Sequence, residues 1–199
     1  MQNKDSIELF IFDFDGTLVN LPVNWKKLKE DLRRLLRSKS SLVPLFPSLE
    51  AITKNNRELR EKAWKLVEEY ELDAVREIKP DFEMVELFNK LQAKGYRIVL
   101  LTLQGKIPVE KALRKLKLQR FFDHIITREE TASREKQIEE MLKLSNVKPS
   151  KAIVVADRLH DISTASRLGC KTIAITGKSY IKSDYKFADV KQIVEIFAK

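Results

Sequence analysis

Five short apolar runs along the chain predict buried strands. They are rich in β-branched residues and do not alternate with polar ones, as expected of strands covered on both faces. They lie at residues 9–12, 97–103, 123–127, 151–156 and 171–176. The segments between the later runs carry apolar residues at helical spacing and end in glycine, as at Gly95 and Gly169. This alternation predicts an α/β fold: a doubly wound, Rossmann-like parallel sheet between two layers of helices.

Residues 20–79 interrupt the alternation of strands and helices. They contain several stretches with apolar residues at helical spacing and no strand-like run. Pro44 and Pro47 are expected to lie between two of these helices. We therefore predict a small helical domain inserted after the first strand of an α/β core, with the core formed by residues 1–19 and 80–199 and the helical domain by residues 20–79.

Composition favours a soluble globular protein. At 199 residues and 43% hydrophobic, the chain can bury a core of domain size. The sequence has no signal-peptide pattern at its start and no apolar run near the roughly 18 residues that span a bilayer, so we expect a cytoplasmic protein without a membrane partner. The single cysteine, Cys170, follows a helix-ending glycine, where a buried structural thiol is expected.

The formal charge of +9 raises nucleic acid as a partner, because basic surfaces attract phosphates. However, basic residues are mixed with acidic ones almost everywhere, which is typical of a solvated surface. The most basic stretch, residues 24–39, has apolar residues at helical spacing, so its Lys and Arg fall mainly on the opposite face. Nucleic acid therefore stays an alternative that the sequence does not favour.

Polar side chains follow several of the predicted strands. Asp13 and Asp15 follow the first run, Thr102 ends the second and Asp157 follows the fourth. Because ligands bind beyond the carboxyl ends of parallel strands, we expect these residues to converge. Clustered carboxylates repel one another unless a cation lies among them, and Mg²⁺ prefers such oxygen ligands, which Asp13, Asp157 and Asp161 could supply. Capping of a turn or helix is the alternative role for Asp13 and Asp157.

These residues resemble the motifs of the haloacid dehalogenase superfamily of phosphohydrolases. The first motif, Asp-x-Asp-Gly-Thr, is complete in "DFDGT" at residues 13–17. The second, a Ser or Thr at a strand end, is similar to Thr102 in "LLTLQG". The fourth, paired acids after a strand, is similar to Asp157 and Asp161 in "VVADRLHD". The motifs occur in the order of the family, and the resemblance covers the chain outside the insertion.

The resemblance implies a Mg²⁺-dependent phosphatase. Asp13 would be the nucleophile that becomes an aspartyl phosphate, and Asp15 the general acid and base. Thr102 would hydrogen-bond a phosphoryl oxygen. The metal ligands implied are Asp13, the backbone carbonyl of Asp15, and Asp157, with Asp161 as a further candidate. The second acid, Asp15, favours phosphoryl transfer, because the halide that leaves in a dehalogenase needs no proton.

The third motif of the family is a basic residue, usually Lys, that neutralises the nucleophile and the phosphoryl group. The stretch "TASREKQIEEML" offers Arg134 and Lys136. The spacing to Asp157 favours Arg134 and the residue type favours Lys136, and we predict Lys136. A solvated cation at a helix start is the alternative for either residue.

The insertion at residues 20–79 is similar in position to the helical cap of phosphoglycolate phosphatase-like members of the family. Such a cap excludes macromolecules, so the resemblance implies a small phosphomonoester as substrate. Three other interpretations stay open: a sugar-phosphate mutase, a nucleic-acid-associated protein with or without 3′-phosphatase activity, and an inactive scaffold.

Overall fold

The computed structural model describes residues 7–198, which fold into two compact units. The larger is an α/β unit made of the described residues up to Asn20 and those from Lys79 onward. The smaller unit, Leu21–Ile78, is helical. Within residues 7–198, the structure has no helix that combines the length and the apolar character of a membrane span.

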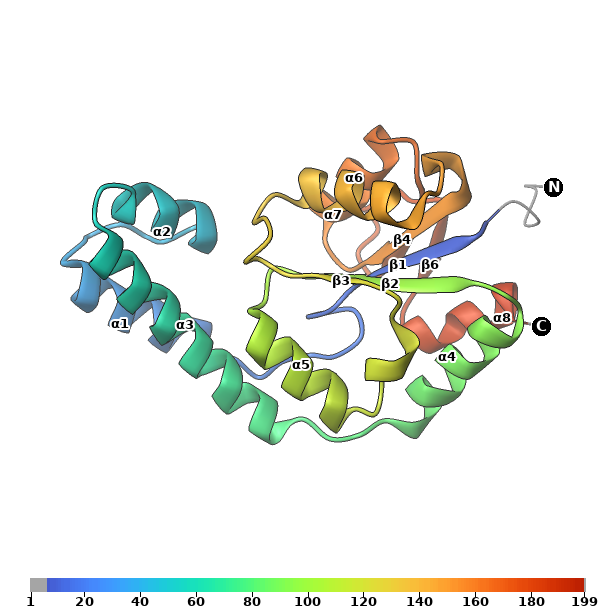
Figure 1. The fold of residues 1–199 in the computed structure, drawn as a ribbon, viewed down its shortest axis with the longest axis horizontal. Coiled ribbons are helices and arrows are strands. Elements are labelled where there is room, and N and C mark those ends of the chain that lie inside the picture. Colours follow the sequence, from blue (N-terminus) through green and yellow to red (C-terminus); the bar gives the residue numbers. More distant parts are fainter. Residues whose placement is uncertain (1–6, 199) are drawn as a thin grey trace. The chain divides into compact units, whose positions relative to one another are not determined.

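The α/β unit contains a parallel sheet, with six strands in the described part of the chain (Figure 1). In chain order the strands are β1 (Leu9–Asp13), β2 (Arg97–Leu101), β3 (Ile125–Ile126), β4 (Ala152–Ala156), β5 (Lys171–Ile175) and β6 (Tyr185–Phe187). Their spatial order is β3-β2-β1-β4-β5-β6, and every pairing is parallel. The predicted doubly wound parallel sheet is therefore confirmed, with β1 and β4 at its centre.

Helices cover both faces of this sheet (Figure 1). On one face lie α6 (Arg134–Ser145) and α7 (Leu159–Arg167), and on the other α4 (Phe82–Ala93), α5 (Lys106–Lys115) and α8 (Val194–Phe197). Short 3₁₀ turns complete the unit at η2 (Gln119–Phe121), η3 (Pro149–Lys151) and η4 (Val190–Ile193).

The side chains of β1 alternate between the two helical layers, as the period of a strand requires. Leu9 and Ile11 pack in the core that includes α6 and α7. Phe10 contacts the ring of Phe197 in α8, and Phe12 lies against α4. The same alternation directs the last residue of the strand, Asp13, toward the α6 and α7 layer.

The edge strand β6 was not predicted from the sequence. Its three residues are partly or fully exposed, so they form no apolar run. The strand is anchored instead through Asp184, whose carboxylate accepts hydrogen bonds from Lys171 and from the backbone and side chain of Thr172. Cys170, next to the start of β5, is buried as expected, and burial raises the pKa of its thiol to about 11.

The helical unit has a hydrophobic core of its own. Its helices are α1 (Trp25–Leu36), α2 (Leu45–Thr53) and α3 (Arg57–Glu77). Leucines of α1 and α2 pack against Ala63 and Val67 of α3, and Trp25 and Trp64 add to this core. Pro47 lies in the first turn of α2, where its missing N–H breaks no bond within the helix, so the expectation that it lies between helices is wrong.

Candidate active site

Three of the predicted site residues lie at the carboxyl ends of neighbouring strands. Asp13 is the last residue of β1, Thr102 follows β2 and Asp157 follows β4. Because β1 pairs with both β2 and β4, Asp13 comes between the other two in the order of the sheet. Asp13 and Thr102 are buried, and Asp157 is partly buried. The sheet thus brings these residues together at the carboxyl ends of its strands, as expected from the sequence.

A tight turn after β1 brings the chain against Asp157. The N–H of Gly16 donates to the carbonyl of Val19, which closes the turn at 2.8 Å. Gly16 has a φ of +90°, in the left-handed region that favours glycine. A Cβ atom at this position would lie 2.6 Å from Oδ2 of Asp157. Glycine therefore permits both the turn that carries Asp15 and the close approach of the Asp157 carboxylate.

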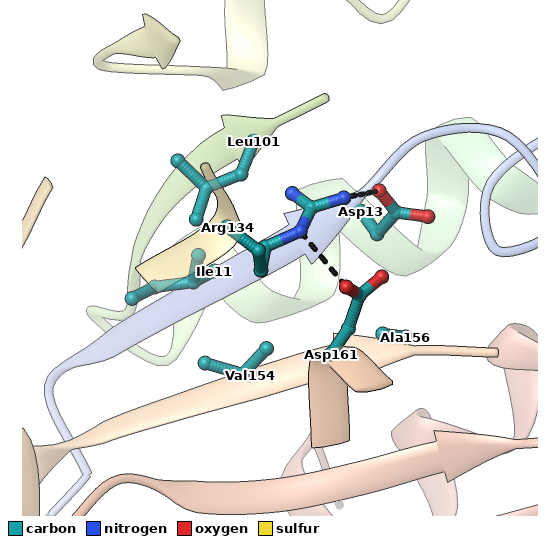
Figure 2. A pocket seen from close by; sticks show the side chains of 7 residues that line it. All are labelled: Ile11, Asp13, Leu101, Arg134, Val154, Ala156 and Asp161. Atoms are coloured by element: carbon teal, nitrogen blue, oxygen red, sulfur yellow. Dashed lines mark hydrogen bonds and ion pairs between the residues drawn. The ribbon is translucent and has the colours of Figure 1, made fainter. Parts of the chain in front are cut away.

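The first residue of α6, Arg134, is a buried cation in contact with Asp13 (Figure 2). Its Nη2 atom lies 2.6 Å from Oδ1 of Asp13, and its Nε atom lies 3.1 Å from Oδ1 of Asp161. All three side chains are less than a tenth exposed. They line a small pocket whose other walls are apolar: Ile11, Leu101, Val154 and Ala156. Unpaired charges would be costly in such surroundings, so Arg134 offsets the burial of the two carboxylates.

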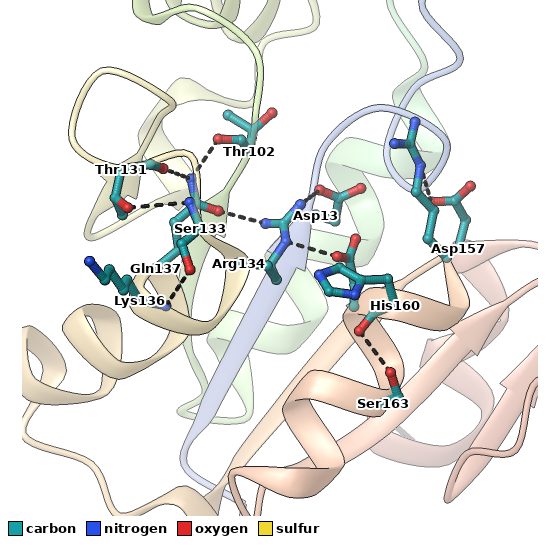
Figure 3. A network of polar contacts seen from close by, with 12 residues as sticks. Asp13, Thr102, Thr131, Ser133, Arg134, Lys136, Gln137, Asp157, His160 and Ser163 are labelled. Carbon is teal, nitrogen blue, oxygen red and sulfur yellow. Dashed lines mark hydrogen bonds and ion pairs between the residues drawn. The ribbon is translucent and has the colours of Figure 1, made fainter. Parts of the chain in front are cut away.

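The prediction that Lys136 is the cation beside Asp13 is wrong, because Arg134 occupies that position. The side chain of Lys136 is exposed, and Figure 3 shows it directed away from Asp13. The helical period explains the difference. Ile138 and Met141 belong to the buried face of α6, and continuing that face one turn toward the N-terminus reaches Arg134 and the buried residue Gln137. This spacing in the sequence could have identified Arg134.

The predicted acid and base, Asp15, lies in the turn after β1 and is partly buried. Nε2 of Gln104 lies 3.4 Å from Oδ2 of Asp15, which is a long hydrogen bond. The backbone N–H of Gln104 also donates to Oγ1 of Thr102 at 3.0 Å. Gln104 is buried, and its Oε1 atom has no hydrogen-bond partner among residues 7–198. Gln104 was not predicted from the sequence, where its only signal is its place two residues after Thr102.

Burial disfavours the charged form of the carboxyl groups in the site. It raises the pKa of Asp13 above the ordinary value, and the nearby charges of Asp161 and Asp157 raise it further, whereas Arg134 acts to lower it. Burial also raises the pKa of Asp157, although the Arg158 guanidinium opposes this. One guanidinium therefore does not fully compensate this group of acids, which favours a further cation.

The oxygen atoms of the site fit Mg²⁺ as that cation. Oδ1 of Asp157 is buried and has no hydrogen-bond partner in the described part of the chain, although Nε of Arg158 lies 3.9 Å away. Among residues 7–198, no three His, Cys, Asp or Glu side chains gather into a complete metal site. Mg²⁺ often takes only one or two carboxylates, however, and completes its coordination with other oxygens. Asp13 and Asp157 end or follow neighbouring strands and can supply such oxygens, and Oδ1 of Asp157 has no hydrogen-bond partner among the described residues. Asp13 and Asp161 each give Oδ1 to Arg134, so only their second carboxylate oxygens are left for a metal.

The chain is similar to known proteins in both sequence and fold. A family model described as "Haloacid dehalogenase-like hydrolase" matches residues 10–175. The "Pyrophosphatase PpaX" of Bacillus mycoides (strain KBAB4) is 26% identical over 212 residues, which cover 97% of this chain and 98% of that protein.

Two solved structures are similar in fold over nearly their whole lengths. One is a haloacid dehalogenase-like family protein, SP0104 from Streptococcus pneumoniae, with a TM-score of 0.73 and 20% identity, covering 97% of this chain and 99% of that one. The other is described as a "predicted phosphoglycolate phosphatase" from Haemophilus somnus 129pt, with a TM-score of 0.73 and 18% identity, covering 98% and 99%.

Proposed function

Since this chain belongs to the haloacid dehalogenase-like hydrolase family, we propose that it is a Mg²⁺-dependent phosphatase acting on a small phosphomonoester. One observation carries the proposal. Asp13 ends a central strand of the sheet, buried and held by Arg134 at 2.6 Å, beside the turn that carries a second acid, Asp15. A buried, oriented carboxylate beside a fixed guanidinium suits nucleophilic attack on an anionic group.

Asp13 is the nucleophile of the proposed reaction. A bond forms between its carboxylate oxygen and phosphorus while the bond from phosphorus to the leaving oxygen breaks, which gives an aspartyl phosphate. Water then attacks this phosphorus, releasing inorganic phosphate and restoring the carboxylate. The hydrogen bond from Arg134 to Oδ1 fixes the Asp13 carboxylate and offsets its charge against the incoming phosphoryl group.

Asp15 is the proton donor and acceptor. It protonates the leaving oxygen in the first step and takes a proton from the attacking water in the second. The amide of Gln104 limits the positions open to the Asp15 carboxylate. The hydroxyl of Thr102, at the end of β2, is placed at the same edge of the sheet to hydrogen-bond a phosphoryl oxygen.

Asp13, Asp157 and the backbone carbonyl of Asp15 would hold Mg²⁺ in this proposal. When bound, the ion supplies positive charge that reduces the repulsion between the Asp13 carboxylate and the phosphoryl group. We propose that Asp161 positions Arg134, whereas the sequence made it a further candidate ligand for the metal. Its carboxylate accepts from Nε of Arg134 at 3.1 Å, so it positions the guanidinium.

The helical unit Leu21–Ile78 is proposed to select the substrate. Its place in the chain, directly after the turn that carries Asp15, supports this role by analogy with the caps of the family. Replacing this unit by that of a relative with a different substrate would test the role, because the preference should follow the helical unit and not the α/β unit.

Inorganic pyrophosphate is a second candidate substrate. The relatives named PpaX are pyrophosphatases by name and align with almost the entire chain. Pyrophosphate carries more negative charge than a simple ester. Arg158 and Lys178, which both act to lower the pKa of Asp157, supply positive charge at this edge of the sheet.

The test is release of inorganic phosphate from p-nitrophenyl phosphate, a panel of small phosphomonoesters and pyrophosphate. The parent protein and Asp13→Asn are compared with Mg²⁺ and with EDTA. Metal-dependent release that is lost in Asp13→Asn supports the proposal. An isomeric phosphorylated product would instead indicate a mutase, and release only from 3′-phosphorylated nucleic acid would indicate the nucleic-acid interpretation. No product from any of these compounds would reject phosphoryl transfer.

A further inference from the structure

A fully buried glutamine in α6, Gln137, connects the elements that carry the site (Figure 3). Its Nε2 atom lies 2.8 Å from the carbonyl oxygen of Thr102 and 2.9 Å from that of Thr131, with the carbonyl of Thr127 at 3.4 Å. Its Oε1 atom accepts a hydrogen bond from Nη1 of Arg134 at 3.0 Å. One amide group thus serves the end of β2, the segment after β3 and the start of α6.

These contacts connect Thr102 and Arg134, which lie far apart in the sequence. Thr102 follows β2, whereas Arg134 begins α6, and residues 127–133 lead from β3 to α6 without regular structure. In the proposed reaction Thr102 hydrogen-bonds a phosphoryl oxygen, and Arg134 holds the carboxylate that attacks phosphorus. The distance between them is set partly by the two ends of a single side chain.

Gln137 also differs chemically from the other partners of Arg134. The guanidinium has a fixed, planar set of donors, and its three nitrogens each contact a different residue: Asp13, Asp161 and Gln137. In the proposed reaction Asp13 becomes an acyl phosphate, so its contact with Arg134 changes. Asp161 and Gln137 do not react, and the Gln137 amide stays neutral throughout.

We propose that Gln137 is a positioning residue that holds the Arg134 guanidinium at a fixed place relative to Thr102. This inference rests on the proposed function, because it gives the amide a role in orienting Arg134, which holds the nucleophile, and Thr102, which would hydrogen-bond a phosphoryl oxygen. It acts through Arg134 and the Thr102 backbone and does not touch the reacting atoms. Small displacements of such groups lower catalytic rates strongly, whereas substrate binding depends on them less.

Two variants distinguish the acceptor function of the Gln137 amide from its donor function. Gln137→Met keeps the length of the side chain and removes both the acceptor for Arg134 and the donors to the three carbonyls. Gln137→Glu keeps an acceptor for Arg134 and removes the donors. We expect Gln137→Met to lower kcat by about 10- to 100-fold, with a much smaller change in KM. Ser145→Ala, at another buried polar position of α6, is the matched control and should leave both constants within about twofold.

A double-mutant cycle distinguishes positioning from general support of the fold. Arg134→Lys removes the planar guanidinium that Gln137 holds, so Gln137→Met should cost less than about threefold in that background. Equal losses in the two backgrounds would overturn the proposal, and so would a Gln137→Met protein with parental kcat. If Gln137→Met does not fold, Gln137→Leu, which also lacks the acceptor for Arg134, takes its place in the cycle.

A spectroscopic measurement keeps the result separate from the proposed function. The Nε–H of Arg134 should give a protected ¹⁵N–¹H signal, assigned by its absence in Arg134→Lys. We expect Gln137→Met to shift this signal and speed its hydrogen exchange, and Gln137→Glu to preserve it. An unchanged signal in Gln137→Met would contradict the positioning role whether or not the parent releases phosphate. Absence of phosphate release in a parent whose signal does respond would reject only the proposed reaction.

Discussion

Nη2 of Arg134 lies 2.6 Å from Oδ1 of Asp13, and both side chains are buried. The two residues come from the start of α6 and the end of β1. Burial raises the pKa of Asp13, and the guanidinium of Arg134 opposes that rise and orients the carboxylate. Arg134 is therefore the basic residue in contact with Asp13 in this chain.

Arg134→Lys should lower kcat/KM by about 100-fold, because Lys keeps the charge but cannot contact Asp13, Asp161 and Gln137 at once. Lys136→Ala should remain within about twofold of the parent, since this side chain is exposed. Phosphate release measured over a range of substrate concentrations checks both values. A large loss in Lys136→Ala together with a mild effect of Arg134→Lys would restore the original prediction.

Gly16→Ala should abolish most of the activity. The new Cβ would lie 2.6 Å from Oδ2 of Asp157, and φ at this residue is +90°. Gly95→Ala is the matched control, because its φ of +84° imposes similar strain while no described residue other than its chain neighbours comes within 4 Å of the added Cβ. Both variants should lose roughly 1–2 kcal/mol of unfolding free energy from backbone strain. Only Gly16→Ala should lose activity as well, and equal activities after correction for folded protein would contradict the close approach to Asp157.

Gln104→Met should affect substrates according to their leaving groups. The Gln104 amide contacts Asp15, whose proton is needed most when the leaving oxygen is a strongly basic alkoxide. We expect a loss of about tenfold in kcat/KM for an alkyl phosphate and a clearly smaller loss for p-nitrophenyl phosphate, because kcat/KM reports the steps up to formation of the aspartyl phosphate, in which the leaving oxygen is protonated. Gln137→Met provides the comparison, since it acts through Arg134 and should affect both substrates alike. Equal losses for both substrates in Gln104→Met would separate Gln104 from proton transfer.

Asp157→Asn and Asp161→Asn should differ in their response to Mg²⁺. Oδ1 of Asp157 is buried without a hydrogen-bond partner among the described residues, whereas Asp161 is bound to Arg134. Asp157→Asn should raise the Mg²⁺ concentration for half-maximal activity by about 10- to 100-fold. Asp161→Asn should lower kcat while leaving the Mg²⁺ dependence near that of the parent. A comparable shift in both variants would show that Asp161 also serves the metal.

The central part of the fold could be predicted from the sequence because its determinants are local. The apolar run at residues 9–12 predicts a buried strand, and the acids directly after it are therefore expected at the carboxyl end of that strand. The peripheral strand β6 has no such signal. Its docking depends on hydrogen bonds from Thr172 and Lys171 to Asp184, which pair residues distant in sequence.

The site residues that directly follow strands could be predicted from their motifs. The choice between Arg134 and Lys136 could not, because it depends on which face of α6 is buried. Arg134 and Lys136 are two positions apart, so they point to different sides of α6, and only the buried stripe through Ile138 and Met141 separates them. Gln104 and Gln137 act through backbone carbonyls and neighbouring side chains. Contacts of that kind depend on the folded arrangement and leave no pattern in a single sequence.

The most direct test of the account is to trap the covalent intermediate. The protein would be mixed with Mg²⁺ and a ³²P-labelled substrate found in the panel, quenched in acid within one turnover and digested. We expect an acid-stable, hydroxylamine-sensitive label on the peptide that contains Asp13, and no label in Asp13→Asn. Phosphate release at the parental rate by Asp13→Asn, or a label on another residue, would contradict the assignment of Asp13 as the nucleophile.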